Sequence, residues 1–386
     1  MISRVAEHCF WYGRYLERTE STARVLAVTN NLALDAELTP EQCWLPAIIV
    51  AGERERFLAK HGAEAAGSSE TVPVYLTWDD DNTASIVCSV ASARENARSI
   101  REVLSLEGWE ATNELYLWLL GPGRDGGDPQ APGPAGGRAD YDRDRYAFYR
   151  HISRQVQLCL GMLRSTMLQD TPLDFIWLGV MLERVGQTAR VLDVHHHAFT
   201  NLTGRQEVVE TALWLSLLRA CSGFEPFMKR HQGKVTGDAV ASFLMFEPDF
   251  PRSIRFCLDA AHSRFFEHIR PSDQPSLPGA ETAARLRALA EWLRSRSYEE
   301  LGSSIHGLLT RVVDETAEVC NVLSRELFYV GKDETLLNEA SPTPPGPVTA
   351  GVVPALAGTK SAPAEMRQSQ SQGGGEAPGA VRLVEA

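Results

Sequence analysis

The spacing of apolar side chains predicts helices along most of the chain. At about 100° per residue, apolar positions of the stretch 11–28, such as Tyr12, Leu16, Ala23 and Leu26, fall on one broad face. No convincing strand pattern is found, so we predict an all-α fold. Helices are expected over residues 3–34, 40–61, 83–105, 107–120, 141–169, 172–199, 205–231, 237–246, 251–269, 279–296 and 298–329.

The strongest regularity is an internal repeat. Trp11–Val28 and Trp177–Val194 share eleven of eighteen residues at an offset of 166, and further matches follow downstream. We therefore predict two duplicated helical units of about 168 residues, packed as a multi-helix bundle. The predicted organisation is a first helical repeat over 1–120, a Gly/Pro-rich linker or insertion over 121–140, a second helical repeat over 141–336, and a disordered tail over 337–386.

Turn and capping residues divide these segments. Asp79–Asn82 is expected to supply the N-cap of the helix that begins near residue 83, and Asp249–Pro251 repeats that start signal in the second half. The alignment of the two halves also places Ser85 on Ser253. The chain should therefore begin a helix in the same way at both places.

One narrow stripe of the repeated helix keeps its identities in both halves. Gly13, Glu17 and Arg24 lie opposite the apolar face, and Gly179, Glu183 and Arg190 correspond to them. A solvated face has little reason to keep its residues, because surface substitutions are usually nearly neutral. Glycine inside a helix also costs about 1 kcal/mol relative to alanine. We infer that another helix or a ligand packs closely against the stripe.

The charged residues of the stripe allow three interpretations. Glu17 and Arg24 are seven residues apart, too far to pair well within one helix. They could form reciprocal ion pairs across the two halves, Glu17 with Arg190 and Glu183 with Arg24, or they could be exposed. They could also line a shared pocket that binds a carboxylate or phosphate. In that pocket Glu17 and Glu183 would be catalytic acids, bases or metal ligands, and Arg18, Arg24, Arg184 and Arg190 would bind the anion.

A second charged run, Arg94–Arg101, follows the first capping region. Its three arginines and Asn96 could hold an oxyanion, or they could be solvated charge. The second half has nothing comparable at Ala261–Arg264. The anion-binding candidates from this run are Glu95, Asn96, Arg98 and Arg101.

Other motifs give little chemistry. Consecutive histidines, as in His195–His197, point in different directions on a helix, and no Glu-x-x-His pair accompanies them, so we predict no metal site. Phosphate-binding loops, nucleophile elbows and zinc-protease motifs are absent from the sequence. The sequence leaves any cofactor unknown.

Composition narrows the class of protein. A net charge of −12 and a pI of about 5.4 argue against nucleic-acid binding. No apolar run is long enough for a transmembrane helix, and no signal peptide is recognised. Seven dispersed cysteines without a C-x-x-C motif fit a reducing cytoplasm, which is the expected location.

Three blocks of sequence carry a resemblance to a known family. The run 2–26, the segment Asp80–Ile86 and the block Ala93–Arg101 resemble the bacterial alpha-E domain family. The resemblance implies an all-helical domain whose Glu and Arg residues form a site. It also implies association with a circularly permuted ATP-grasp protein similar to amide or peptide ligases. A transglutaminase-like peptidase and a proteasome-like peptidase are further implied partners.

The resemblance favours one function over two others. We expect an accessory or substrate-presenting protein that acts with the ATP-grasp ligase in a peptide-modification system. The alternatives are an enzyme that acts itself on a peptide or acyl-phosphate intermediate at the Glu/Arg pocket, and a purely structural scaffold.

Overall fold

The protein is described by a computed structural model, which is all-α as the sequence predicts. Residues 3–35, 38–121, 136–200, 207–233, 235–272, 274–298 and 305–328 are described, so most of the predicted linker and the whole predicted tail lie outside these ranges. The regular elements within them are helices: α1 Ser3–Asp35, α2 Pro40–Ala51, α3 Arg54–His61, η1 Glu64–Gly67, α4 Thr71–Trp78, α5 Ile86–Ser99, α6 Leu106–Leu120, α7 Gly137–Arg143, α8 Arg145–Thr166, α9 Thr171–Thr200, α10 Glu207–Ala220, α11 Phe224–Arg230, α12 Gly237–Phe246, α13 Ile254–Arg264, η2 Phe265–Ile269, α14 Ala280–Arg294, α15 Ile305–Leu323 and η4 Ser324–Phe328.

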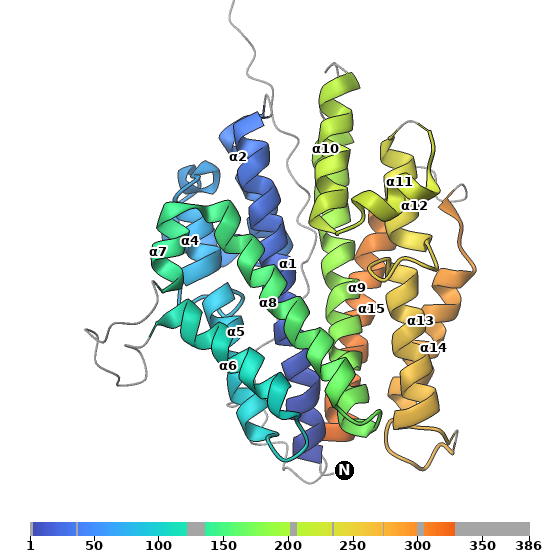
Figure 1. Cartoon of the computed structure of the whole chain (residues 1–386). Coiled ribbons are helices and arrows are strands. Elements are labelled where there is room, and N and C mark those ends of the chain that lie inside the picture. Colours follow the sequence, from blue (N-terminus) through green and yellow to red (C-terminus); the bar gives the residue numbers. More distant parts are fainter. Residues whose placement is uncertain are drawn as a thin grey trace, which may run out of the picture. The chain divides into compact units, whose positions relative to one another are not determined.

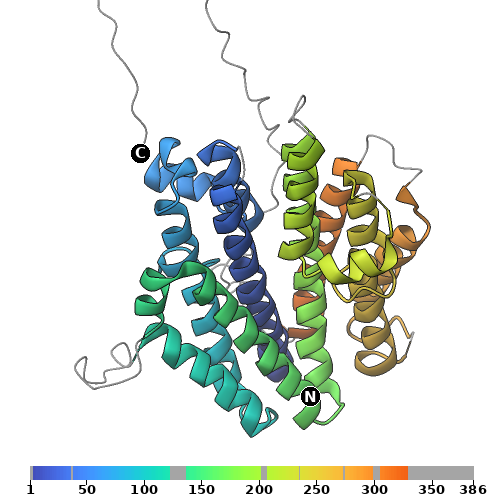
Figure 2. The ribbon, with the colours of Figure 1, turned by 45° about the horizontal axis from the view of Figure 1, so that its top comes forward.

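Two long helices form the centre of the described part. α1 and α9 lie side by side, and they hold the two halves of the repeated sequence (Figure 1, Figure 2). Helices α5 and α8 pack against α1, with α6 against both of them. Helices α13 and α15 pack against α9, with α14 against both of them. The three helices around α1 are therefore arranged in the same way as the three around α9.

The two central helices touch backbone to backbone. A Cβ atom on Gly13 would lie 2.0 Å from the carbonyl oxygen of Ile176, and a Cβ on Gly179 would lie 2.1 Å from that of Phe10. Gly13 faces Ile176 and Val180, and about one turn further along both helices Glu17 and Arg18 face Arg184 and Glu183. Residue numbers therefore increase together along the contact, so α1 and α9 run in the same direction. The close approach inferred from the two interior glycines is confirmed.

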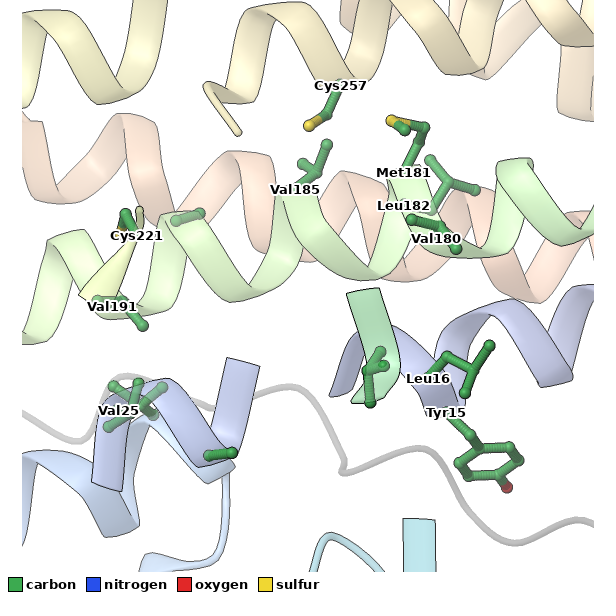
Figure 3. Packing of buried hydrophobic residues seen from close by; sticks show 14 of the residues in the cluster. Tyr15, Leu16, Val25, Val180, Met181, Leu182, Val185, Val191, Cys221 and Cys257 are labelled. Atoms are coloured by element: carbon green, nitrogen blue, oxygen red, sulfur yellow. The ribbon is translucent and has the colours of Figure 1, made fainter. Parts of the chain in front are cut away.

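Apolar side chains fill the space around this contact. Val180 of α9 lies on the side of that helix nearer Leu16 of α1, Leu182 lies further round the same helix, and Cys257 of α13 approaches Val185 of α9 (Figure 3). All five side chains are at most 1 % exposed. Burial of such side chains is the main favourable contribution to folding.

Two helices predicted as continuous are broken at matching places. The helix expected over 40–61 ends at Gly52, whose φ of 76° lies in the left-handed region that favours glycine. The helix expected over 205–231 is interrupted at Ser222, with a φ of 54°, beside Gly223. Periodicity alone did not reveal these breaks, because apolar residues resume in phase after each one.

The capping residues also differ from those expected. Ser85 caps α5 by accepting a hydrogen bond from the backbone N–H of Cys88 at 3.2 Å, and Ser253 caps α13 through Phe256 at 3.0 Å. The aspartates before them are not the caps. The side chain of Asn82 is bonded to the backbone of Tyr75 and Ala84, which fixes the turn before the cap. A further helix, α4, was not predicted at all.

Helix α8 lies within the predicted second repeat, but it packs against helices of the first. Helix α7 contacts α6 and α8, and α8 contacts α1 and α6. The bounds of the two repeats stay a prediction. Whether the halves descend from one copied unit stays a prediction.

The glycine contact gives the first testable prediction. Gly13→Ala or Gly179→Ala forces a methyl group into a carbonyl oxygen of the other helix, so we expect a loss of about 1–3 kcal/mol or more in the free energy of unfolding. Urea unfolding measures it. Gly161→Ala in α8 is the control, because no atom lies within 4 Å of the place that its Cβ would take. It should stabilise the protein by up to about 1 kcal/mol. Equal effects at all three positions would contradict the contact.

Candidate functional site

Two buried groups of charged side chains lie along the contact between α1 and α9. We call one the Glu17 cluster and the other the Glu183 cluster. The Glu17 cluster consists of Glu17, Glu20, Arg24, Arg184 and Arg252. The Glu183 cluster consists of Glu183, Arg14, Arg18 and Arg190.

In the Glu17 cluster two carboxylates share three guanidinium groups. Arg184 donates to both oxygens of Glu17, with Nε–Oε1 of 3.0 Å and Nη2–Oε2 of 2.6 Å. Arg252, from the loop before α13, bridges Glu17 at 2.8 Å and Glu20 at 2.7 Å. Arg24 donates twice to Glu20, at 2.9 and 2.6 Å. Both carboxylates have no exposed surface, so these hydrogen bonds and ion pairs replace their water, and among the described residues Oε2 of Glu20 has the ion pair with Arg252 alone.

The Glu183 cluster holds one carboxylate between two arginines of α1. Arg14 donates to Oε2 of Glu183 through Nε at 2.8 Å and Nη2 at 2.7 Å. Arg18 donates through Nε to Oε1 at 2.9 Å and through Nη2 to Oε2 at 3.2 Å, and Gln187 adds a bond at 3.1 Å. Burial opposes ionisation, but Arg18 and Arg14 hold the pKa of Glu183 well below its ordinary value.

The ion pairs are reciprocal, but not between the predicted residues. The sequence led us to expect Glu17 with Arg190 and Glu183 with Arg24, and both pairings are wrong. Because α1 and α9 run in the same direction, each glutamate is level with its counterpart. The arginine seven residues on lies about 10 Å further along the axis. The arginine that directly follows each glutamate is in reach instead, so Glu17 binds Arg184 and Glu183 binds Arg18.

Arg190 differs from its counterpart Arg24. Arg24 pairs with Glu20 one turn earlier, whereas the residue one turn before Arg190 is Gly186. The guanidinium group of Arg190 lies against this glycine, with Nη1 3.4 Å from the place that a Cβ on it would take, and its Nε donates to the carbonyl of Val50 at 3.1 Å. Among the described residues no carboxylate forms an ion pair with Arg190.

The Glu183 cluster consequently has an excess of positive charge. Three guanidinium groups face one carboxylate, whereas three face two in the Glu17 cluster. Burial lowers the pKa of Arg190 to about 10; Glu183 offsets part of this, and Arg18 and Arg14 add to it. The group stays charged at neutral pH, and the surroundings favour an added anion.

A further buried carboxylate, Glu53, is influenced by the charge of Arg18, but its bonds go to residues outside the two clusters. Its carboxylate accepts a hydrogen bond from Tyr75 at 2.9 Å and forms an ion pair with Arg56 at 3.4 Å. Burial raises the pKa of Glu53, while Tyr75, Arg56 and Arg18 offset part of that shift. The described bonds of Glu53 therefore go to Tyr75 and Arg56, and none of its described ion pairs is with an arginine of the Glu183 cluster.

The anion-binding candidates on α5 make local contacts. Glu95 and Arg98 pair with each other at 2.6 Å and are both more than half exposed. Asn96 is bonded to His8 at 2.8 Å, and Arg101 stacks on Trp109 at 4.6 Å. These contacts bring none of the four into either cluster, in contrast to the shared site that the resemblance implies.

Sequence reasoning missed two arginines of the clusters. Arg14 lies on the repeated helix, but its counterpart is Val180, so it left no repeated signal. Arg252 lies in a loop, where its counterpart in the first half is Ala84. Both residues are charged in one half and uncharged at the matching position of the other, and this difference is the signal that could have identified them.

Two histidines of the run, His195 and His196, have contacts that the structure describes. His195 is buried, and its Nδ1 lies 2.8 Å from the carbonyl oxygen of Val191, while the ring of His196 packs on Trp214. Within the described ranges, no group of three or more His, Cys, Asp or Glu side chains is placed to hold a metal ion. Likewise, none of the described helices is long and apolar enough to cross a membrane.

The ion pairs predict a large stability effect at Glu183. Glu183→Gln leaves Arg14 and Arg18 buried without a counter-charge, so we expect unfolding to become easier by about 3–5 kcal/mol. Chemical denaturation measures the change. Glu95→Gln is the matched control, because it removes an exposed pair worth about 0–1 kcal/mol. A Glu183→Gln protein as stable as the control would argue against a structural role.

The same carboxylates predict acid sensitivity. The pKa of Glu20 falls to about 2 in the fold, because Arg252, Arg24 and Arg184 outweigh burial, and that of Glu183 is also lowered. A group with a lowered folded pKa contributes stability above its unfolded pKa of about 4.3 and loses it as the pH falls. Stability should therefore decrease from about pH 4.3 towards pH 2, and less steeply in Glu183→Gln. Identical slopes would count against the assignment.

Comparisons with known proteins identify a family. Uncharacterised proteins of Mycobacterium bovis and of two Mycobacterium tuberculosis strains are each 26 % identical over 310 residues, which is 76 % of this chain and 32 % of theirs. The chain thus spans about a third of the length of these relatives, and no solved structure matches it. A family model described as a predicted alpha-helical domain with a conserved ER motif matches residues 1–328. Glu-Arg dipeptides at Glu17 and Glu183 supply both clusters, and the chain belongs to the Alpha-E family.

Proposed function

We propose that this protein is an accessory binding protein that presents an anionic substrate group to a circularly permuted ATP-grasp amide or peptide ligase. The observation that carries the binding role is the Glu183 cluster, where Arg190 has no carboxylate partner among the described residues. The ligase, and the peptide-modification system around it, come from the family resemblance alone.

The contacts of the two glutamates favour binding over catalysis. A general acid or base needs a pKa near the working pH and a free oxygen that can reach the substrate. Glu183 has a lowered pKa and accepts five bonds, from Arg14, Arg18 and Gln187. Both oxygens of Glu17 are likewise bonded to arginines. These carboxylates hold guanidinium groups in place, which suits recognition of an anion.

The arginines are held in defined orientations. The guanidinium carbon of Arg14 lies 4.9 Å from the centre of the Trp11 ring, and that of Arg18 lies 5.5 Å from the centre of the Tyr15 ring. A guanidinium group fixed by stacking and by a carboxylate loses little conformational freedom when it binds a further group. Such preorganisation supports affinity for a carboxylate or phosphate.

Substitution of Arg190 tests the proposal. Arg190→Gln removes the positive charge that has no paired carboxylate, so stimulation of the ligase should fall about ten- to hundredfold, as loss of a charged hydrogen bond predicts. The measurements are co-purification with the ligase and its rate of ATP turnover. Stability should change by only about 1 kcal/mol, the value of the bond to Val50.

Arg98→Gln is the control for this experiment, because Arg98 is an exposed arginine outside both clusters. It should leave ligase stimulation unchanged. If the wild-type protein neither co-purifies with the ligase nor alters its turnover, the proposed function is wrong.

A further inference from the structure

We propose that the Glu183 cluster binds a carboxylate from outside the described chain, in the role that the carboxylate of Glu20 has in the Glu17 cluster. The ligand is a small carboxylate or the carboxylate of a peptide. This inference deepens the proposed function and rests on it for its biological setting.

The two clusters share a common plan. Each has the arginine that follows the opposite glutamate, Arg184 in one and Arg18 in the other. Each also has an arginine seven residues after its own helix's glutamate, Arg24 in α1 and Arg190 in α9. Equivalent arginines in equivalent places provide an internal reference for what the second cluster should bind.

The plan differs at one acidic position. In α1 the carboxylate of Glu20 receives two bonds from Arg24, one from Gln157 at 2.9 Å and the charge of Arg252. The corresponding residue of α9 is Gly186. The second cluster therefore keeps the arginine that holds this carboxylate and lacks the carboxylate itself.

The structure accommodates a side chain at this position. The three atoms nearest to a Cβ on Gly186 would belong to the guanidinium group of Arg190, at 3.4 to 3.8 Å, which is ordinary contact distance. Close packing therefore does not require glycine at position 186, unlike at Gly13 and Gly179. Its effect is to leave Arg190 without the carboxylate that Arg24 has.

The charges favour a monoanion over a dianion. One added carboxylate would give the Glu183 cluster two negative groups against three positive ones, the balance that the Glu17 cluster already has. A phosphate dianion would bring the Glu183 cluster to three negative charges against three positive ones, which departs from that balance. A planar carboxylate also matches the fork of a guanidinium group.

The test measures carboxylate binding to the full chain without the ligase. Butyrate, a tripeptide with a free C-terminus, the same tripeptide amidated, and inorganic phosphate are titrated at one ionic strength by calorimetry. Binding of butyrate or the free tripeptide supports the proposal. Binding of butyrate alone identifies a small-molecule ligand, and a preference for the free over the amidated tripeptide identifies a peptide terminus. Tighter binding of phosphate, or no binding of any carboxylate, overturns it.

Substitution of Gly186 tests the location. Gly186→Glu supplies the missing carboxylate one turn before Arg190, so binding should weaken at least about tenfold. Its melting temperature without ligand should exceed that of Gly186→Ala, which gains the same helix propensity and only a methyl group. Gly186→Ala should keep wild-type binding.

The outcomes separate this inference from the proposed function. Undiminished binding by Gly186→Glu, or a melting temperature no higher than that of Gly186→Ala, would place the ligand elsewhere or exclude it. Carboxylate binding without any effect on the ligase would overturn only the proposed function. An effect on the ligase without carboxylate binding would overturn only this inference.

Discussion

The structure depends on reciprocal ion pairs buried between two parallel helices. Glu17 binds Arg184 and Glu183 binds Arg18 across the contact of α1 with α9. Glycines at the same level of both helices bring the backbones together one turn before these pairs. Without the close approach the side chains would not span the gap, and without the pairs the buried charges would strongly disfavour the contact.

Buried ion pairs stabilise a fold less than their short distances suggest. The cost of removing each charge from water offsets much of the attraction, and apolar replacements of similar volume are often equally stable. What the pairs provide here is register, because a shift of one helix by a turn would separate Glu17 from Arg184 and Glu183 from Arg18. The register in turn fixes the heights of Arg24 and Arg190, which are held by the same two helices. The site is therefore positioned by the interaction that aligns the halves.

The sequence predicted the parts of this arrangement that depend on local pattern. Apolar periodicity indicated the helices, and the interior glycines Gly13 and Gly179 indicated close packing. The partners of the glutamates could not be predicted, because they depend on the relative direction of α1 and α9, and the sequence of each helix does not encode that direction. Arg252 was missed for a related reason: a loop residue reaches the cluster only after α13 has packed on α9. The breaks at Gly52 and Ser222 were missed because the apolar pattern continues across them.

The difference between the clusters suggests why only one of them would be a binding site. In the Glu17 cluster every arginine has a carboxylate from the chain itself, so an added anion would have to displace one and lose its bonds. In the Glu183 cluster position 186 is a glycine and supplies no carboxylate, while Arg190 is present. The ionised carboxylate of Glu183 offsets part of the positive charge there. If the halves are copies of one unit, as the repeat predicts, the clusters have diverged at Glu20 and Gly186 as well as at Arg14 and Arg252, and the loss of one carboxylate is the difference from which we propose that only the Glu183 cluster binds an external carboxylate.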